Sequence, residues 1–410
     1  MNKHEGLATE EKTLKGNSNI SGTMGDSNIL LIHYSEIALK RGRRTFFERR
    51  LVENIRESIS RLGVRRVRRT NARILGELSK DVDEGLVSQA MRRIFGVAWF
   101  AFAYGVRSDF DEIQKTVLML LRGRIENADS FKIETRRSYK AFPLSSVEVN
   151  ERIGTEVVRE FGKRVDLAKP LLTVFIEIAK NTTCIYFRKF KGPGGLPVGS
   201  SGRVLCLLSG GFDSPVAAWL MLKRGANVSY IHFHPFSDNS EVLTSKIIEL
   251  VRYLVPYSGP TRIHIVPAYP FTLAISSLAP RYDVVLFRRY MFKVAEEIAA
   301  KIGAEALVTG ESLAQVASQT LQNIRVIHQD LKFPVFMPLI AYDKEEIVDL
   351  AKKIGTYDIS LKPYKDCCSI ISSHPETKAK LDILESLESE ADITSAAKES
   401  IARSIMFEVK

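Results

Sequence analysis

Cysteine is scarce in this sequence. Four cysteines in 410 residues are too few to hold a secreted disulfide scaffold together, so the composition indicates an intracellular protein with reduced thiols. Long apolar runs are also missing. No stretch of eighteen or more apolar residues occurs, and we expect a cytoplasmic protein without a membrane span. Residues 1–27 are polar and lack the apolar stretch of a secretion signal, which predicts a disordered tail.

Acidic residues are under-represented in only one half of the chain. Residues 28–202 contain 33 Lys and Arg against 20 Asp and Glu, whereas residues 203–410 contain 23 against 24. Neutralising a polyanion releases its condensed counterions, so this concentrated positive charge favours nucleic acid as the partner of the first half. A generally basic surface is the alternative, and it would have spread the charge evenly. The length predicts two or three domains.

The first half, residues 28–190, has the pattern of an α+β fold with mixed strand pairing. Apolar residues recur with a helical period in 45–62 and in 82–95, and Gly63 stands where the first of these helices would end. Segments such as 99–106 alternate like strands. This half therefore predicts helices packed on a sheet.

Residues 191–202 hold five glycines and two prolines, which predicts a linker and a domain boundary. A glycine-rich phosphate loop is the alternative there, but no strand leads directly into a helix. Beyond this stretch, strands and helices alternate as in a doubly wound parallel sheet, whose ligand belongs at the carboxyl ends of the strands. We expect strands at 204–208, 228–233, 262–266 and 306–309, and helices at 215–224, 241–254, 282–301, 345–354, 377–387 and 391–407.

The strongest local signal lies where the first of these strands ends. A buried apolar strand runs into Ser-Gly-Gly, and a helix is predicted to start with Ser214 as N-cap and Pro215 in its first turn. Two glycines allow a tight turn that presents N–H groups to an anion. An ordinary, routinely capped strand-to-helix turn is the alternative. Asp213 argues against it, because a carboxylate beside a phosphate requires a cation such as Mg²⁺ between them.

This loop, Ser209-Gly210-Gly211-Phe212-Asp213-Ser214, resembles the SGGxDS loop of the PP-loop ATP pyrophosphatases, which cleave ATP between the α- and β-phosphates and form an adenylated intermediate. Five further stretches narrow the resemblance: His33–Lys40 (HYSEIALK), Arg136–Pro143 (RRSYKAFP), Gly195–Gly199 (GLPVG), Thr309–Leu321 (TGESLAQVASQTL) and Cys367–Lys378 (CCSIISSHPETK). In this order they make the chain similar to the tRNA 4-thiouridine synthetases, or tRNA sulfurtransferases, from about residue 29 to about residue 385.

The resemblance implies a multi-domain protein, α+β followed by α/β. Its parts would be a ferredoxin-like domain at 28–85, a THUMP RNA-binding domain at 86–190, the linker at 191–202, a PP-loop domain at 203–385 and a helical extension at 386–410. ATP contacts carried over from the family are Leu207, Leu208, His232, Phe233, Arg288, Gly310 and Gln319. Ser209, Gly210, Gly211 and Ser214 would cradle pyrophosphate, and Asp213 would order Mg²⁺.

Two of these positions also suit their roles on chemical grounds. Arg288 carries a permanent cation that can hold a phosphate. Gly310 would let the nucleotide approach the end of a strand. On its own, Arg288 would equally fit an exposed cation on a helix.

The family's RNA-binding role implies contacts from Lys40 and from a short stretch at 136–142, where cations for phosphate alternate with rings for stacking. Without the family, a solvated charge run explains the same residues. The implied RNA contacts are Lys40, Arg136, Arg137, Tyr139, Lys140 and Phe142.

The four cysteines fall into two kinds. Cys184 and Cys206 lie within predicted strands and read as small core residues. Cys367 and Cys368 lie in a polar stretch, and alignment with the family points to Cys368 as the catalytic thiol with Cys367 as its rival. No Cys-x-x-Cys pair occurs, so we expect neither an iron–sulfur cluster nor zinc.

The predicted function is an ATP- and Mg²⁺-dependent tRNA sulfurtransferase that converts a uridine, at position 8 by resemblance, to 4-thiouridine. Longer family members append a rhodanese-like domain with a further cysteine, which we expect to be absent here. Sulfur would then come from a separate donor, and a role in thiamine synthesis and a homodimer stay open. The alternatives are a PP-loop enzyme acting on a small acid and a non-catalytic tRNA-binding protein.

Overall fold

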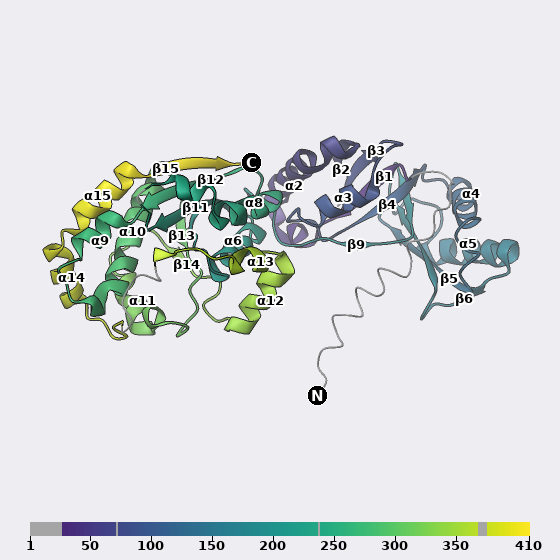
Figure 1. Ribbon diagram of the computed structural model, residues 1–410. Coiled ribbons are helices and arrows are strands. Elements are labelled where there is room, and N and C mark those ends of the chain that lie inside the picture. Colours follow the sequence, from purple (N-terminus) through teal and green to yellow (C-terminus); the bar gives the residue numbers. More distant parts are fainter. Residues whose placement is uncertain (1–26, 71–72, 237, 368–374) are drawn as a thin grey trace, which may run out of the picture. The chain divides into compact units, whose positions relative to one another are not determined.

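The structure, a computed structural model, describes residues 27–70, 73–236, 238–367 and 375–410. The expected tail up to residue 26 and the predicted thiol Cys368 lie outside the described residues. The described chain forms two compact units, each shown in Figure 1. The first unit contains 27–34, 55–91 and 98–191, and the second contains 35–54, 92–97 and 192–410.

The first unit is built on one nine-stranded sheet in the order β2-β3-β1-β4-β8-β7-β5-β6, with β9 pairing with β4. Strand β4 pairs antiparallel with β1 along one part of its length and with β8 along another, so the sheet continues without a break past the expected boundary at residue 85. The strands are β1 (Ile29–His33), β2 (Val64–Thr70), β3 (Arg73–Leu78), β4 (Trp99–Val106), β5 (Ser130–Arg137), β6 (Arg164–Val165), β7 (Leu172–Ile178), β8 (Thr183–Tyr186) and β9 (Phe190–Lys191).

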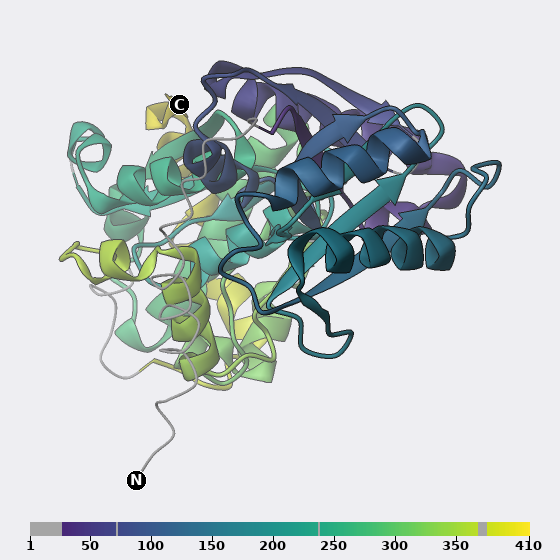
Figure 2. The same cartoon turned by 90° about the vertical axis from the view of Figure 1, so that its right-hand side faces the viewer.

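Two helices, α4 (Phe110–Leu121) and α5 (Ser146–Phe161), cover the same face of β5, β7 and β8, as Figure 2 shows. The side of each helix that faces the sheet carries apolar residues, among them Val117 on α4 and Ile153 on α5. Both are fully buried and pack in one core with Ile133 and Ile176 of the sheet. A capping box at Ser145 starts α5, because its side chain and that of Glu148 bond each other's backbone amides. The remaining helices of the N-terminal part are α2 (Arg44–Ile59) and α3 (Glu84–Met91).

The second unit contains a six-stranded sheet in the order β14-β13-β10-β11-β12-β15. Five neighbouring strands run parallel, and β15 pairs antiparallel with β12. This confirms the mostly parallel α/β sheet. The strands are β10 (Arg203–Leu207), β11 (Asn227–His234), β12 (Thr261–Pro267), β13 (Ala306–Val308), β14 (Val335–Phe336) and β15 (Ile405–Val409).

Helices cover both faces of this sheet, as a doubly wound fold requires. Helices α6, α8 and α12 build one core and α9, α10, α14 and α15 build the other. None of the helices in the described part of the chain combines the length and apolarity needed to span a bilayer. The helices are α6 (Asp213–Lys223), α7 (Ser240–Leu243), α8 (Lys246–Ser258), α9 (Tyr269–Ala274), α10 (Asp283–Ile302), α11 (Leu321–Ile327), α12 (Lys344–Ile354), α13 (Tyr357–Leu361), α14 (Leu381–Glu390) and α15 (Ile393–Arg403).

The glycine-rich stretch before β10 is packed, not a free tether. Leu196 and Val198 are only 3% and 5% exposed. The carbonyl of Val198 accepts hydrogen bonds from Arg50 and Asn54 of α2, at 2.9 and 3.1 Å. A Cβ on Gly195 would lie 2.2 Å from a backbone oxygen, so glycine is required by close approach there. Glycine in this stretch serves tight packing.

Three local predictions differ from the structure. Helix α6 begins two residues earlier than expected: Phe212 is its N-cap, and Ser214 lies within the first turn. The segment predicted as one helix at 391–407 is α15 followed by the strand β15, because the alternating apolar residues after Arg403 complete the sheet. Phe46, one of the apolar residues that recur with a helical period in 45–62, is 45% exposed although such a stripe predicts burial.

Candidate active site

In the loop between β10 and α6, serine hydroxyl groups bond backbone amides of the same loop. Ser214 Oγ accepts a hydrogen bond from the Ser209 amide at 2.8 Å and lies 3.1 Å from Ser209 Oγ. The Gly211 amide donates to Ser209 Oγ at 3.4 Å. Amides and hydroxyls are thus gathered at the N-terminus of α6, where the helix dipole favours a bound anion.

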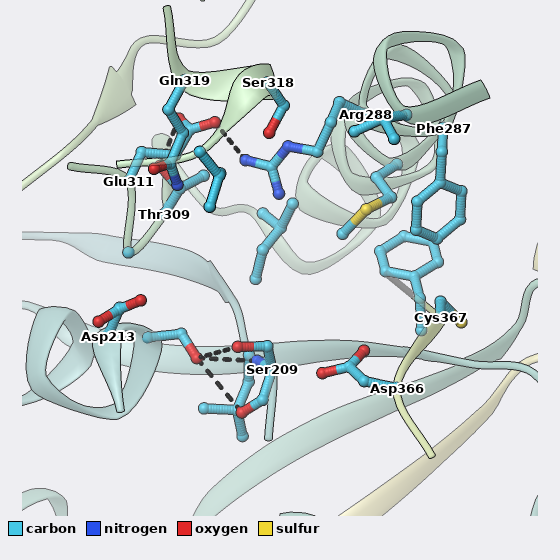
Figure 3. Close-up of a pocket in the computed structure, with 18 of the residues that line it drawn as sticks. Ser209, Asp213, Phe287, Arg288, Thr309, Glu311, Ser318, Gln319, Asp366 and Cys367 are labelled. Atoms are coloured by element: carbon cyan, nitrogen blue, oxygen red, sulfur yellow. Dashed lines mark hydrogen bonds and ion pairs between the residues drawn. The ribbon is translucent and has the colours of Figure 1, made fainter. Parts of the chain in front are cut away.

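A cavity of about 340 Å³ opens beside this loop, at the carboxyl ends of β10, β11 and β13. Figure 3 shows Ser209 and Asp213 on one side of it and Arg288 and Glu311 on the other. In a doubly wound sheet a crevice at the carboxyl edge is the usual ligand site. The lining residues are Leu207, Leu208, Ser209, Asp213, Ser214, Phe233, Val284, Phe287, Arg288, Met291, Thr309, Gly310, Glu311, Val316, Ala317, Ser318, Gln319, Asp366, Cys367 and Pro375.

Most of the predicted nucleotide contacts line this cavity, although the chain brings them from four separate segments. Gly210, Gly211 and His232 are not among the lining residues. Gly210 is turned toward Lys246 and Tyr364, whose side chains a Cβ there would meet. The eight predicted ATP contacts that line the cavity are Leu207, Leu208, Ser209, Ser214, Phe233, Arg288, Gly310 and Gln319.

His232 lies behind the cavity wall and acts on Leu208. It is 1% exposed, and burial lowers the pKa of its imidazole to about 4, so the ring is neutral at neutral pH. Nδ1 is 2.8 Å from the carbonyl of Leu208, and Nε2 is 2.7 Å from the hydroxyl of Tyr364. Because a carbonyl only accepts, Nδ1 carries the proton and Tyr364 donates to Nε2. His232 thereby fixes the backbone at the strand end.

The apolar side of the cavity comes largely from α10, which the sequence reasoning did not single out. Phe287 and Met291 lie one turn apart on that helix and line the cavity together with Phe233 from β11. A ring and a polarisable thioether form a flat apolar surface that suits an aromatic base. In the sequence, Phe287 and Met291 stand four positions apart on a predicted helix. Core packing explains this spacing equally well.

Arg288 lines the cavity as predicted, but its guanidinium is engaged with a carboxylate. It forms an ion pair with Glu311, which is 1% exposed and also accepts from Thr309 Oγ1 at 2.9 Å. Burial alone would raise the pKa of Glu311, but the guanidinium charge of Arg288 and the nearby imidazole of His328 prevail and lower it to about 2. The ion pair with Glu311 therefore holds Arg288 in place on one wall of the cavity.

Asp213 has partners that the sequence did not reveal. Its Oδ1 is 2.8 Å from the ammonium of Lys344, at the start of α12, and its Oδ2 accepts from Gln315 Nε2 at 3.1 Å. A lysine therefore already provides a cation beside the anion-binding loop. Lys344 therefore offsets this carboxylate in the structure, and Mg²⁺ at Asp213 stays a prediction.

Close packing of the backbone requires glycine at position 310. A Cβ there would lie 2.6 Å from the amide nitrogen of Ser214 and 2.7 Å from the carbonyl carbon of Asp213. These are backbone atoms at the start of α6, so they cannot move aside as a flexible side chain can. The glycine lets the end of β13 contact the loop Ser209–Ser214, for which we use the name phosphate loop below.

Replacing Gly310 by alanine is expected to lower the free energy of unfolding by about 2 kcal/mol, because the added methyl group overpacks two backbone segments. Urea unfolding of the full chain measures this. Gly123→Ala is the control, since nothing lies within 4 Å of a Cβ at that position. Equal effects of the two substitutions would contradict the close-approach explanation.

Three of the four cysteines lie within the described residues, and two of these lie in the core as predicted. Cys184 and Cys206 are fully buried, and burial raises the pKa of their thiols to about 11 and about 12, which confirms them as core residues. Cys367 is 5% exposed and lines the cavity with Asp366. Its neighbour Cys368 lies outside the described residues. Among the described residues, no three His, Cys, Asp or Glu side chains converge as a metal site.

The predicted RNA contacts divide between surface and core. Arg136 and Lys140 are exposed, and Lys40 is half-buried beside Glu36. Arg137 donates to the carbonyls of Phe142 and Leu144, at 2.8 and 3.1 Å, and so holds its own loop together.

One of the implied contacts needs correction. Phe142 is 3% exposed and packs in the core under α4 and α5, so it is a core residue rather than a stacking ring. Tyr139 packs against the same core but is only partly buried. Alternation of rings with cations did not distinguish inward from outward positions.

Comparison with known proteins places this arrangement in a family. The family model described as thiamine biosynthesis protein (ThiI) matches residues 199–393, the THUMP domain model matches 107–188 and the ThiI ferredoxin-like domain model matches 29–101. A probable tRNA sulfurtransferase of Moorella thermoacetica is 41% identical over 88% of this chain and 92% of its own length. Another, from Brevibacillus brevis, is 37% identical over 93% of this chain and 96% of its own length.

A solved structure shares the whole arrangement. The crystal structure of a 4-thiouridine synthetase–RNA complex with bound ATP is 34% identical, with a TM-score of 0.84, and covers 94% of this chain and 100% of that one. Along this chain the family models match in the order ferredoxin-like domain, THUMP domain and ThiI domain. The chain therefore belongs to the ThiI family of tRNA sulfurtransferases, with ferredoxin-like, THUMP and ThiI domains.

Proposed function

We propose that this chain uses ATP to adenylate O4 of a tRNA uridine, at position 8, and then replaces that oxygen by sulfur. The observation that carries the proposal is the turn of amides and hydroxyls at Ser209–Ser214, which opens into a cavity with an apolar wall. Membership of the family, with a relative solved with ATP and RNA, supports it. The products are 4-thiouridine, AMP and pyrophosphate.

The cavity offers a place for each part of the nucleotide. Phe233, Phe287 and Met291 would receive the base, and the turn around Ser209 would hold the β- and γ-phosphates. In the first step the uracil O4 attacks the α-phosphorus and the bond to pyrophosphate breaks. In the second, a sulfur nucleophile attacks C4 and AMP leaves with the oxygen.

Magnesium fits the oxygen donors that face the cavity. Mg²⁺ prefers carboxylates combined with substrate phosphates, and the carboxylates of Asp213 and Asp366 both line this space. Asp213 is the residue that would hold the ion, since it stands at the phosphate loop. When bound, Mg²⁺ would neutralise phosphate charge, while Lys344 orients the same carboxylate.

Sulfur handling is assigned to the cysteine pair. Cys367 lines the cavity, and the chain continues directly into Cys368, which we propose as the working thiol. A thiolate there would take the outer sulfur of a persulfide on a cysteine desulfurase or a carrier, and the donor would leave as a thiol. After that sulfur has attacked C4, a thiol reductant would cleave the sulfur–sulfur bond, form a disulfide with the cysteine and free the thiolated base. Free sulfide, in contrast, would attack C4 directly. The same transfer chemistry would suit a contribution to thiamine synthesis.

The first half would hold the RNA. Exposed cations such as Arg136 and Lys140, in a half of the chain that carries the excess positive charge, are the expected phosphate contacts. Binding of tRNA should therefore weaken steeply as salt is raised.

The deciding experiment incubates unmodified tRNA, ATP, Mg²⁺, a cysteine desulfurase with cysteine, and a thiol reductant with the full chain, and follows the near-ultraviolet absorbance of the thiolated base. Cys368→Ala is expected to lower thiolation by at least about tenfold, because the thiol that carries the persulfide is lost. Pyrophosphate release should persist in this variant. Cys367→Ala is the matched control and should keep most of the activity.

Two outcomes would contradict the proposal. Pyrophosphate release that does not depend on tRNA would favour an enzyme acting on a small acid. Full activity of Cys368→Ala with a persulfide donor would show that this thiol is not the sulfur carrier.

A further inference from the structure

Adenylation of the uracil O4 requires a base as well as a site for phosphate. The ring nitrogen N3, next to C4, carries one hydrogen. When O4 bonds to the α-phosphorus, the C4–O4 double bond becomes single and a double bond forms between N3 and C4, so the N3 proton must leave. This proton becomes more acidic as O4 gives up its electrons, and a carboxylate is then a strong enough base to accept it.

Three carboxylates among the described residues line the cavity, those of Asp213, Glu311 and Asp366. Glu311 is paired with Arg288 and has a pKa of about 2, which makes it a poor proton acceptor. Asp213 Oδ1 is 2.8 Å from the ammonium of Lys344, and this carboxylate is the one proposed to hold Mg²⁺. Both of these carboxylates therefore serve a cation.

The third carboxylate, Asp366, lies where the phosphate loop meets the thiol side of the cavity. Its Oδ2 accepts from the Gly210 amide at 3.3 Å. The next residue, Cys367, also lines the cavity, and Figure 3 shows Asp366 between Ser209 and Cys367. Because C4 of the uracil must be reached by sulfur while its O4 reaches a phosphate, the ring edge with O4, C4 and N3 belongs at the same place.

The chain that leads to Asp366 is held by hydrogen bonds. The Tyr364 hydroxyl donates to Nε2 of the buried His232 at 2.7 Å. Lys246 Nζ donates to the carbonyl of Lys362, also at 2.7 Å. A base must stand within hydrogen-bond reach of the proton that it takes, and these contacts fix the backbone that carries this carboxylate.

We propose that Asp366 is the catalytic base of adenylation and accepts the N3 proton while O4 attacks the α-phosphorus and pyrophosphate leaves. The same proton returns later. Sulfur replaces AMP at C4, and once the sulfur is free of its carrier, N3 takes the proton back from Asp366 and the C4–sulfur bond becomes double. The carboxylate is then ionised again, so the cycle neither gains nor loses a proton. This inference rests on the proposed function.

The test follows pyrophosphate formation in single turnovers, with the full chain in excess over unmodified tRNA, and with ATP and Mg²⁺ but no sulfur donor. The rate constant then reports adenylation alone. Asp366→Asn is expected to lower it by about a hundredfold, because an amide does not accept the proton. Asp366→Glu keeps a carboxylate and should recover about tenfold of this loss. Asp358→Asn removes an exposed carboxylate of α13 and should behave as the wild type.

A more acidic substrate separates proton transfer from simple structural damage. Fluorine at C5 of uracil withdraws electrons and makes the N3 hydrogen more acidic, so the reaction depends less on a base. With a single 5-fluorouridine at the target position of the tRNA, the deficit of Asp366→Asn relative to the wild type should shrink by about tenfold. Asp366→Ala should show the same shrinkage. Each protein is compared with itself on two tRNAs, so a smaller folded fraction does not alter the ratio.

The outcomes distinguish the base from the function on which it rests. A wild-type rate in Asp366→Asn, or the same deficit on both tRNAs, would overturn the role of Asp366 alone. If the wild type formed no pyrophosphate on addition of tRNA, the proposed function would fail, and the catalytic base with it.

Discussion

Asp213→Asn is expected to lower kcat/KM for tRNA thiolation by about a hundredfold to a thousandfold, the range seen when one preorganised charged or polar group is removed from a transition-state site. The amide has the shape of the carboxylate and can still accept from Gln315. It cannot balance the ammonium of Lys344, 2.8 Å away, and it is a much weaker ligand for Mg²⁺. Steady-state thiolation with saturating sulfide measures the effect.

Asp349→Asn is the control for Asp213, because it removes an exposed carboxylate from α12 in the same unit. The control should retain wild-type kinetics, and both variants should unfold at nearly the wild-type temperature. If Asp213→Asn worked at the wild-type rate, the phosphate loop would not be the place where ATP is activated. Measuring pyrophosphate release in parallel shows whether the loss falls on adenylation or on the sulfur step.

Glu311→Gln is expected to lower the free energy of unfolding by about 3 kcal/mol, since breaking a buried ion pair leaves its partner charge uncompensated. Glu311 is 1% exposed, and its partner Arg288 has a side chain that is 15% exposed. The glutamine keeps the volume and can keep the bond from Thr309. Urea unfolding at neutral pH measures the difference.

The control for this buried pair is Glu399→Gln, which breaks an ion pair with Arg403 at 2.9 Å between side chains that are 48% and 55% exposed. Solvent screens such a pair, so the expected loss is less than about 1 kcal/mol. Similar losses in the two variants would mean that burial does not increase the contribution of the Arg288–Glu311 ion pair to the free energy of unfolding.

The same pair predicts a dependence on pH. The pKa of Glu311 is about 2 in the folded protein, below its ordinary value of 4.5. A carboxyl group with a lowered folded pKa stabilises the fold fully above its unfolded pKa and loses that contribution as the pH falls toward the folded value. The wild type should therefore lose the advantage over Glu311→Gln between about pH 4.5 and about pH 2. A constant difference across this range would contradict the ionisation.

The phosphate loop could be predicted from the sequence because its geometry is local. A strand, two glycines and a helix start within nine residues, so Ser209, Gly211 and Ser214 had to lie close together whatever the rest of the chain did. The cap was misplaced by two residues, since the Ser214 hydroxyl bonds the Ser209 amide rather than the helix that it begins. Local spacing located the turn but not its hydrogen bonds.

The partners of the charged residues could not be predicted in this way. Lys344 is 131 positions from Asp213, and Arg288 is 23 positions from Glu311. Nothing in the residue types marks these pairs, because only the stacking order of the strands brings them together. Phe142 shows the same limit for burial, since its position on a core-facing turn depends on α4 and α5.

The second unit is assembled from segments that lie far apart in the sequence, and this has a consequence for folding during translation. Segments 35–54 and 92–97 leave the ribosome well before 192–410, yet they belong to that later unit. The hydrogen bonds from Arg50 and Asn54 to Val198 close loops of nearly 150 residues. Such long-range closure is slow, so the early segments must wait without their partners while translation proceeds. A nascent chain of this kind should bind chaperones more than one that folds in order from its first residue.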